Sequence, residues 1–337
     1  VISYLYLLWQ FHRYLRIIYS QIHFLINVNK NVIKWSCIVH RTILSNESMD
    51  NDLRTIDDCY TKFGLTNTSK SENSLPDDVR FFQRIVLTPK ERANLPSNAS
   101  FFMGTLIHEA VQNMLVNKVK LNEITKILNE KVKEYNVSEK DKIKANLIAK
   151  QAPQIIQNIV GEVLKLESNL NFKAETEYTI WDDRIGTYFR CFLDLEGSEY
   201  FYDFKNLFGS IRETKKGWSI SKRKIDDKIF TKDIMSMALY KKAVPHLKPC
   251  LIYATEDEVT AFHEDNTPEL RPDNLIKYYD ELIMYQKIWE NKLRYADGDI
   301  KKLAGIIKTD FSEIRKDSFW WKGVDAQYIE RLTKLYV

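Results

Sequence analysis

The middle of the chain reads FKAETEYTIW at residues 172–181, TYFRCFLDL at 187–195 and YFYDFKN at 200–206. Apolar and polar residues alternate with a period of two in the first segment, which is typical of a β-strand, and the other two are rich in aromatic residues. The residues EGSE at 196–199 supply turn chemistry between the last two segments. We therefore predict an antiparallel meander here and assign the other elements around it.

Helical patterns flank this meander on both sides. Apolar residues recur at helical spacing over residues 100–118, 121–135 and 138–168, and Pro153 is expected to kink or split the third helix. After the meander, the pattern predicts a helix at 232–243, a strand at 249–254 and a long helix at 272–295 whose apolar side includes Ile276. This order predicts an α/β (α+β) fold in which helices flank a central mixed sheet, with a helical N-terminal part.

The chain divides into three regions at the level of sequence. Residues 1–48 precede the first methionine, Met49, and carry five basic residues against one acid, with apolar stretches shorter than the roughly 20 residues of a membrane span. We expect this segment to be a dispensable extension, the alternative being an amphipathic helix that packs on the domain. Residues 49–96 form an N-terminal region with a polar linker, TNTSKSENS at 66–74, and residues 97–337 form the main domain.

Composition excludes several classes of protein. The net charge is +4, and it is balanced once residues 1–48 are set aside, so a nucleic-acid surface would have to be a local patch. The chain has no GxxxxGK[ST] and no GxGxxG, which leaves P-loop and Rossmann nucleotide sites without a motif. Its four cysteines have no CxxC spacing, which argues against a zinc ribbon or a cysteine-held cluster and favours reduced thiols.

Two acids and a lysine lie on the predicted hairpin. If the turn centres on Gly197 and Ser198, Asp194 lies opposite Phe201 and shares a sheet face with Asp203 and Lys205. The two aspartates are then diagonal neighbours about 7–8 Å apart, a separation at which both can bind one Mg²⁺ or Mn²⁺ ion. The alternatives are a solvated sheet face and a structural Asp–Lys ion pair.

Two more residues are candidates for the same site. His108 lies on an otherwise apolar helix, where a lone histidine is more often a core residue than a ligand. Gln112 stands where a zinc protease of the HExxH type needs its second histidine, so that class is excluded. Glu177, on the strand before the hairpin, is a further candidate acid in a supporting role, although an exposed strand glutamate is the alternative.

Taken in order, these residues resemble a known family. Gly104-x-x-x-His108 on a helix, a strand glutamate, Asp194, Asp203-x-Lys205 and a helix with Tyr240 resemble the PD-(D/E)XK nuclease superfamily over roughly residues 97–254. Its RecB-like branch, which includes phage recombination and mitochondrial genome maintenance exonucleases, is the most similar. The resemblance implies a restriction-endonuclease-like core and a Mg²⁺- or Mn²⁺-dependent DNA exonuclease of recombination, replication or repair. It also implies a cytoplasmic protein, in the host cytoplasm if it is phage-encoded.

The resemblance also assigns roles to residues. It implies that His108, Asp194, Asp203 and the backbone carbonyl of Phe204 bind the metal, and that Lys205 is the catalytic lysine that orients water or stabilises charge. The family's helix motif is Q-x-x-x-Y, but Ser236 stands in place of the glutamine before Tyr240, which puts the DNA-positioning role of this helix in doubt.

The family's iron–sulfur members have cysteines near the C-terminus. This chain has Phe319, Trp320 and Trp321 there instead, so no cluster is expected.

A basic stretch follows the predicted catalytic lysine. Residues 205–228 hold eight basic residues against three acids, together with aromatic side chains, a composition that suits a single DNA strand because cations follow phosphates and rings stack on bases. The alternative is a solvated surface loop. Besides Tyr240, the residues expected to bind nucleic acid are Arg212, Lys215, Lys216, Trp218, Lys222, Arg223 and Lys224.

The partners expected from these features are DNA, single-stranded or with free ends, and a helicase, polymerase or recombinase, with no membrane. A second interpretation is a catalytically inactive DNA-binding or assembly subunit built on the nuclease fold, and a third is a scaffold with a structural ion pair.

Overall fold

The computed structural model describes residues 54–337. The expectations for residues 1–48 therefore lie outside the described residues.

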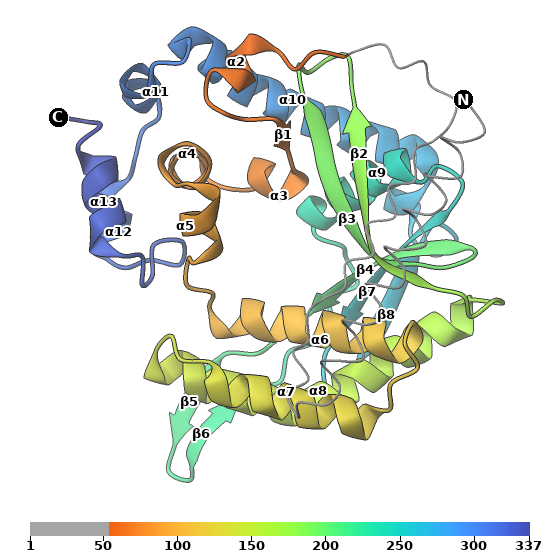
Figure 1. Cartoon of the computed structure of the whole chain (residues 1–337). Helices are drawn as coiled ribbons and strands as arrows, with labels where there is room; N and C mark the ends of the chain where they lie inside the picture. Colours follow the sequence, from red (N-terminus) through yellow and green to blue (C-terminus); the bar gives the residue numbers. More distant parts are fainter. Residues whose placement is uncertain (1–53) are drawn as a thin grey trace, which may run out of the picture. The chain divides into compact units, whose positions relative to one another are not determined.

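The predicted meander forms the centre of a six-stranded mixed sheet (Figure 1). Strand β3 pairs along its whole length with β2, and its other edge is shared by β1 and β4. The sheet continues through β7 to β8, and the pairs β1–β3 and β4–β7 are parallel. The strands are β1 (Asn67–Thr68), β2 (Lys173–Trp181), β3 (Tyr188–Glu196), β4 (Tyr200–Asn206), β7 (Lys248–Ala254) and β8 (Val259–His263).

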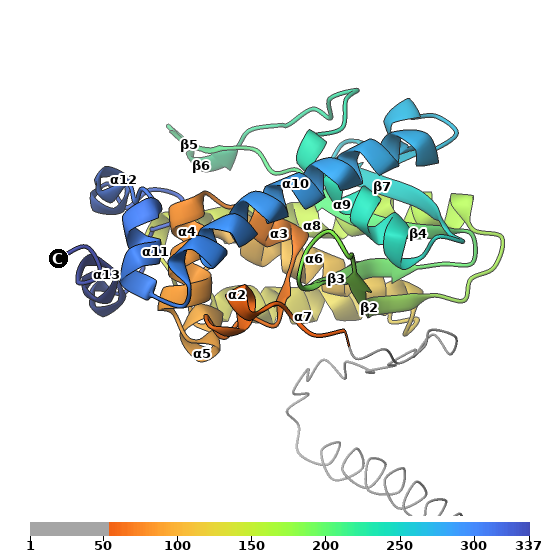
Figure 2. The same ribbon diagram turned by 90° about the horizontal axis from the view of Figure 1, so that it is seen from above.

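Helices cover both faces of this sheet (Figure 2). The helices α6 (Ala99–Leu115), α7 (Leu121–Glu134) and α8 (Glu139–Leu166) bury their apolar residues with Leu195, Phe204 and Ile252. On the other face, α9 (Thr231–Ala243) and α10 (Pro272–Ala296) pack on Phe201 and Leu251. The predicted α/β architecture, a mixed sheet flanked by helices, is confirmed.

A third apolar cluster joins the two ends of the described chain. Short helices that precede α6 pack against the end of α10 and the C-terminal helices, with Phe82 and Trp321 in contact at the centre. The elements concerned are α2 (Asp58–Thr61), α4 (Asp77–Phe81), η1 (Phe82–Val86), α11 (Ile300–Ile306), α12 (Phe311–Arg315) and α13 (Ala326–Thr333). The remaining short helices are α3 (Lys70–Asn73), α5 (Pro89–Ala93) and η2 (Pro268–Leu270), and Leu270 of η2 packs in the cluster of α9 and α10.

Several local predictions were wrong. The polar run at 66–74 is not a linker but contains β1 and α3, because its polar side chains bond to buried partners in the domain. Pro153 does not split the helix: α8 runs through it without a break. Ile276 is 56% exposed although it was placed on the buried side of α10.

Within residues 54–337, no helix is both long and apolar enough to cross a bilayer.

Candidate functional site

The site begins with the turn between β3 and β4, which is shaped by a carboxylate from another element. Glu167 follows α8 and is buried, and its two oxygens accept hydrogen bonds from the backbone N–H groups of Ser198, Glu199 and Tyr200 at 3.0–3.2 Å. The hydroxyl groups of Ser198 and Tyr202 donate to the same carboxylate. The hydrogen bonds to Glu167 stabilise a wider turn than the sequence predicted.

The wider turn shifts the strand register by two residues. Leu195 pairs with Tyr202, so Asp194 is aligned with Asp203 and not with Phe201 as predicted. The ladder stops there, and β3 and β4 separate beyond it. The carboxylate of Asp194 lies in this fork, where its Oδ2 accepts a 2.8 Å hydrogen bond from the N–H of Phe204. The two aspartates are therefore directly opposite each other when the register is extended by one residue, whereas the sequence predicted diagonal neighbours.

Helix α6 brings His108 to the fork. Asn98 caps the helix by accepting a hydrogen bond from the N–H of Phe101, and a buried apolar face holds the helix on the sheet. The Nδ1 atom of His108 lies 3.4 Å from Asp194 Oδ2, and its ring packs edge-on against Phe204. Burial lowers the pKa of His108, but the attraction of Asp194 outweighs it and the pKa is raised above its ordinary value.

One turn further along α6, Gln112 contacts the same strand. Its Nε2 donates both to the backbone carbonyl of Asp194 (2.9 Å) and to Glu175 Oε1 (2.8 Å). Glu175 is opposite Asp194 in the β2–β3 register and has a φ of 50°, a left-handed conformation that is strained for a residue with a side chain. Burial raises the pKa of Glu175, and the charge of Asp194 adds to that effect.

The strand glutamate predicted to support the site was the wrong one. Glu177 forms a two-pronged ion pair with Arg190, at 2.7 and 3.1 Å, and pairs across the ladder with Phe192. Phe192 itself is 37% exposed. Glu175 is the residue that accepts a hydrogen bond from Gln112 and whose pKa is raised by the charge of Asp194. The sequence signal was the E-x-E spacing in β2, but the left-handed residue could not be read from it.

The second acid pairs with the predicted catalytic lysine. Asp203 is 3% exposed, and Lys205 Nζ contacts its Oδ2, which has no well-aligned hydrogen-bond partner among the described residues. Burial and the neighbouring Asp194 raise the pKa of Asp203. Burial lowers the pKa of Lys205, but the attraction of Asp203, Asp194 and Asp233 outweighs it, so the ammonium is held charged.

The pKa of Asp194 is shifted in the opposite direction from that of Asp203. Its burial raises the pKa, but the attraction of His108 and Lys205 and the hydrogen bond from Phe204 together lower it below the ordinary value. The two aspartates therefore differ in their electrostatics: Asp194 is a stabilised carboxylate, and Asp203 is a buried acid whose charge depends on a cation beside it.

Helix α9 adds two groups to the other side of the fork. Asp233 is buried and accepts a 2.7 Å hydrogen bond from the hydroxyl of Tyr253. The Tyr240 ring packs edge-on against Phe201, and burial together with the charges of Asp203 and Asp194 raises its pKa well above the usual value. Ser236 is buried and its hydroxyl donates to the carbonyl of Lys232 in the same helix, so it does not face the fork as a glutamine substitute. Asp233 was missed because a lone acid in a helix gives no signal in the sequence.

The basic stretch after Lys205 forms a separate hairpin. Strands β5 (Ile211–Thr214) and β6 (Gly217–Ile220) pair with each other and not with the main sheet. Trp218 is 38% exposed, whereas Phe208, the other aromatic of this stretch, packs into the core. Lys222 makes an ion pair with Asp257. The exposed basic residues of this stretch include Arg212, Lys215, Lys216, Lys222, Arg223 and Lys224.

The residues at the fork fit a divalent cation by their chemistry. They offer a charged carboxylate at Asp194, the imidazole of His108 and a buried oxygen of Asp203 that lacks a well-aligned hydrogen bond. In the described part of the chain, no three or more His, Cys, Asp or Glu side chains are gathered tightly enough to hold an ion, and Lys205 is the cation that contacts Asp203. The arrangement is two pairs, His108 with Asp194 and Asp203 with Lys205.

Comparisons with known proteins give no family for this chain. No family model matches it, and no curated protein matches it. The crystal structure of a protein named SSO0001 is similar over 55% of this chain and 86% of its own, at 16% sequence identity and a TM-score of 0.24. A likeness at this TM-score carries no argument about fold or function.

Proposed function

We propose that this protein is a Mg²⁺- or Mn²⁺-dependent nuclease of the PD-(D/E)XK type, a DNA exonuclease that hydrolyses phosphodiester bonds in single strands or at duplex ends. The single observation that carries the proposal is the fork. Asp194 and Asp203 meet there at the point where β3 and β4 part, with Lys205 on the second acid and His108 on the first. A scaffold protein has no need for a buried acid and a half-buried acid in register, since burial of each costs free energy.

The residues at the fork would have two separate roles in hydrolysis, binding of the cation and stabilisation of charge. His108, Asp194, Asp203 and the carbonyl of Phe204 would hold the cation, which when bound polarises a phosphate oxygen and lowers the pKa of bound water. Lys205 carries a fixed positive charge because three aspartates surround it. Placed beside a phosphate, that charge stabilises the extra negative charge that develops as water attacks.

The exposed β5–β6 hairpin supports a route for the DNA. It lies only a few residues after Lys205 and presents Arg212, Lys215, Lys216 and the half-exposed Trp218. Cations that track phosphates and an aromatic ring that stacks on a base are the usual means of binding a single strand. The proposal includes a cytoplasmic location and a helicase, polymerase or recombinase as a partner.

The test is cleavage of end-labelled single- and double-stranded DNA with Mg²⁺, Mn²⁺ or EDTA. We expect metal-dependent products that are lost with EDTA, and a drop of at least about 100-fold in Asp203→Ala and in Lys205→Ala. The exposed lysine Lys133 supplies the control Lys133→Ala, which should cleave like the unchanged protein. Wild-type cleavage by a folded Asp203→Ala or Lys205→Ala variant would refute the proposal.

A second function is supported by Ser236. Its hydroxyl is tied to its own helix, so α9 lacks the amide with which the resembled nucleases position DNA. An inactive DNA-binding or assembly subunit would retain the fold without the reaction. Titration with Mn²⁺ separates the two: an inactive subunit should bind no Mn²⁺ at the fork, whereas the nuclease should bind it and lose it in Asp194→Asn.

A further inference from the structure

A gap in the sheet lies directly beside the fork. One edge of β3 pairs with β1 at Tyr188 and Phe189 and with β4 at Leu195 and Glu196, so no strand pairs with that edge between these points. Because β1 runs parallel to β3, the chain that leaves β1 heads toward Asp194. The first residues after β1 are Ser69 and Lys70. The topology therefore places Lys70 at the mouth of this gap.

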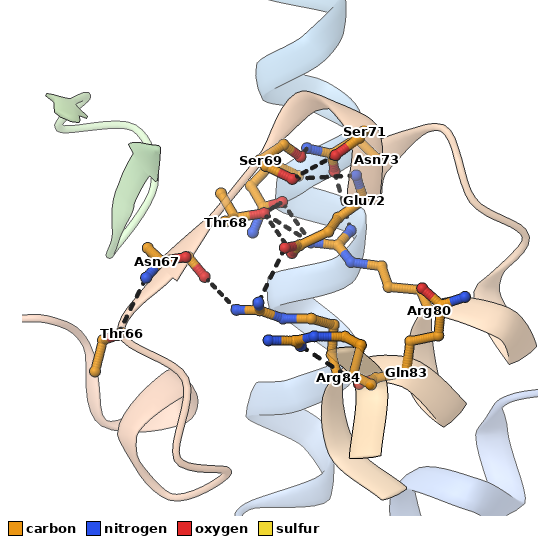
Figure 3. Close-up of polar contacts among 12 residues, drawn as sticks. Thr66, Asn67, Thr68, Ser69, Ser71, Glu72, Asn73, Arg80, Gln83 and Arg84 are labelled. Atoms are coloured by element: carbon orange, nitrogen blue, oxygen red, sulfur yellow. Dashed lines mark hydrogen bonds and ion pairs between the residues drawn. The ribbon is translucent and has the colours of Figure 1, made fainter. Parts of the chain in front are cut away.

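The segment that carries Lys70 is held firmly to the domain. We call residues 66–74 the arch. Thr68 is buried, and its Oγ1 accepts a hydrogen bond from Arg80 Nη2 at 3.0 Å (Figure 3). The same Nη2 donates to Gln286 Oε1 at 2.8 Å. Glu72 forms a 3.1 Å ion pair with Arg84. The arch is thus a fixed support and not a loose loop.

A second set of contacts closes the arch on itself. Arg80 Nη1 donates to Asn73 Oδ1 at 2.9 Å, and Ser69 caps α3 by accepting a hydrogen bond from the N–H of Glu72 (Figure 3). The arch side chains that form hydrogen bonds or ion pairs therefore bond to other arch residues, to Arg80 and Arg84, or, from Thr68, to Gln286. Lys70 differs from them: among residues 54–337 its ammonium has neither an ion-pair nor a hydrogen-bond partner.

The surroundings of Lys70 are those of the proposed active site. It is half-buried, and the charged groups that act on it are Asp233, Lys205, Asp203 and Lys232. Burial lowers the pKa of Lys70 to about 8, with the aspartates opposing that effect and the two lysines adding to it. Partial burial of an ammonium group that has no ion-pair partner costs free energy unless an anion binds to it.

We propose that Lys70 is a substrate-binding residue that contacts a backbone phosphate of the DNA bound at the fork. A phosphate there would supply the missing partner of Lys70 and would lie between two ammonium groups, those of Lys70 and Lys205. Charge-assisted contacts of this kind fix the register of a nucleic acid on a protein without reading its sequence. The inference rests on the proposed nuclease function and adds to it a second phosphate contact, delivered by the arch.

The test measures DNA binding in EDTA, where no cleavage takes place. A fluorescein-labelled single strand of 20 nucleotides is titrated with Lys70→Met at several salt concentrations, and its anisotropy is recorded. We expect the affinity to fall about fivefold to tenfold at low salt. The slope of log K against log salt should become shallower by about 0.7, as for one lost phosphate contact on a single strand. Lys70→Gln should show the same loss of affinity and the same shallower slope as Lys70→Met, whereas Lys70→Arg should retain most of the binding.

Stability and a matched control separate this role from a structural one. Lys90 is an exposed lysine of the same N-terminal region, and Lys90→Met should leave the affinity and the slope unchanged. The melting temperature of Lys70→Met should equal or exceed that of the unchanged protein, since the change removes an unpaired, half-buried charge. A Lys70→Met protein that binds like wild type, or one that fails to fold, overturns the proposal.

Cleavage assays tell the two hypotheses apart. If the unchanged protein cleaves DNA and Lys70→Met cleaves it with the same kcat/KM, the role of Lys70 is wrong and the nuclease stands. If no metal supports cleavage while Lys70→Met still shows the weaker, less salt-dependent binding, the nuclease is wrong and the phosphate contact stands.

Discussion

The carboxylate of Asp194 has two separable roles, and a pair of substitutions can separate them. Its Oδ2 accepts a hydrogen bond from the backbone N–H of Phe204, a residue with no exposed surface. The same carboxylate also carries a negative charge next to His108. Asp194→Asn keeps an oxygen acceptor of the same shape and removes the charge. Asp194→Ala removes both. We predict that both variants lose cleavage and that they differ in stability.

The difference follows from the orphaned N–H group. A buried donor left without a partner costs about 1–3 kcal/mol. The loss of the repulsion between Asp194 and Asp203 offsets a part of this cost, since that repulsion raises the pKa of Asp203. We therefore expect Asp194→Ala to unfold about 2 kcal/mol more easily than wild type. Asp194→Asn should stay within about 1 kcal/mol of it.

Thermal unfolding without and with Mg²⁺ measures both roles. A loss of about 2 kcal/mol corresponds to a fall of roughly 4 °C in a protein of this size. Mg²⁺ at ten times its dissociation constant should stabilise the unchanged protein by about 1.4 kcal/mol and neither variant. Equal melting temperatures for Asp194→Ala and Asp194→Asn would refute the role assigned to the Phe204 contact. A Mg²⁺ shift that persists in Asp194→Asn would refute the role of Asp194 as a ligand.

Two further predictions concern carboxylates that stabilise the turns of the sheet. Glu167→Leu leaves the N–H groups of the β3–β4 turn without their acceptor, so urea unfolding should show a loss of about 2–4 kcal/mol, and an unchanged midpoint would contradict the account of the turn. Hydrogen bonds from Arg184, opposed by burial and aided by Tyr279, lower the pKa of Asp182 to about 2, below its ordinary 3.8. The stabilisation is therefore complete above about pH 4 and is lost as the pH falls toward 2. Wild type should exceed Asp182→Asn in unfolding free energy by about 1–2 kcal/mol at pH 6 and converge with it near pH 2, whereas a difference that does not change with pH would contradict this account.

The order of the main elements was determined by the sequence alone. The meander at residues 172–206, helices α6 to α10 and strand β7 were predicted with ends within three residues of those observed, because their apolar periodicity reports directly which face is buried. Four residues of the fork, His108, Asp194, Asp203 and Lys205, were also named from the sequence, whereas Gln112, Glu175 and Asp233 were missed. His108, Asp203 and Lys205 are conspicuous because polar side chains at positions predicted to be buried demand an explanation.

Only the tertiary structure decided how these residues meet. The register of β3 on β4 depends on Glu167, which lies about 30 residues earlier in the chain and binds the N–H groups of the turn. Glu175, and not Glu177, accepts a hydrogen bond from Gln112 of a distant helix, and Glu175 itself has a left-handed backbone conformation. The arch depends on Arg80 and Gln286, which are 206 residues apart. Contacts between residues so far apart leave no periodic trace in the sequence, since they depend on which elements pack side by side.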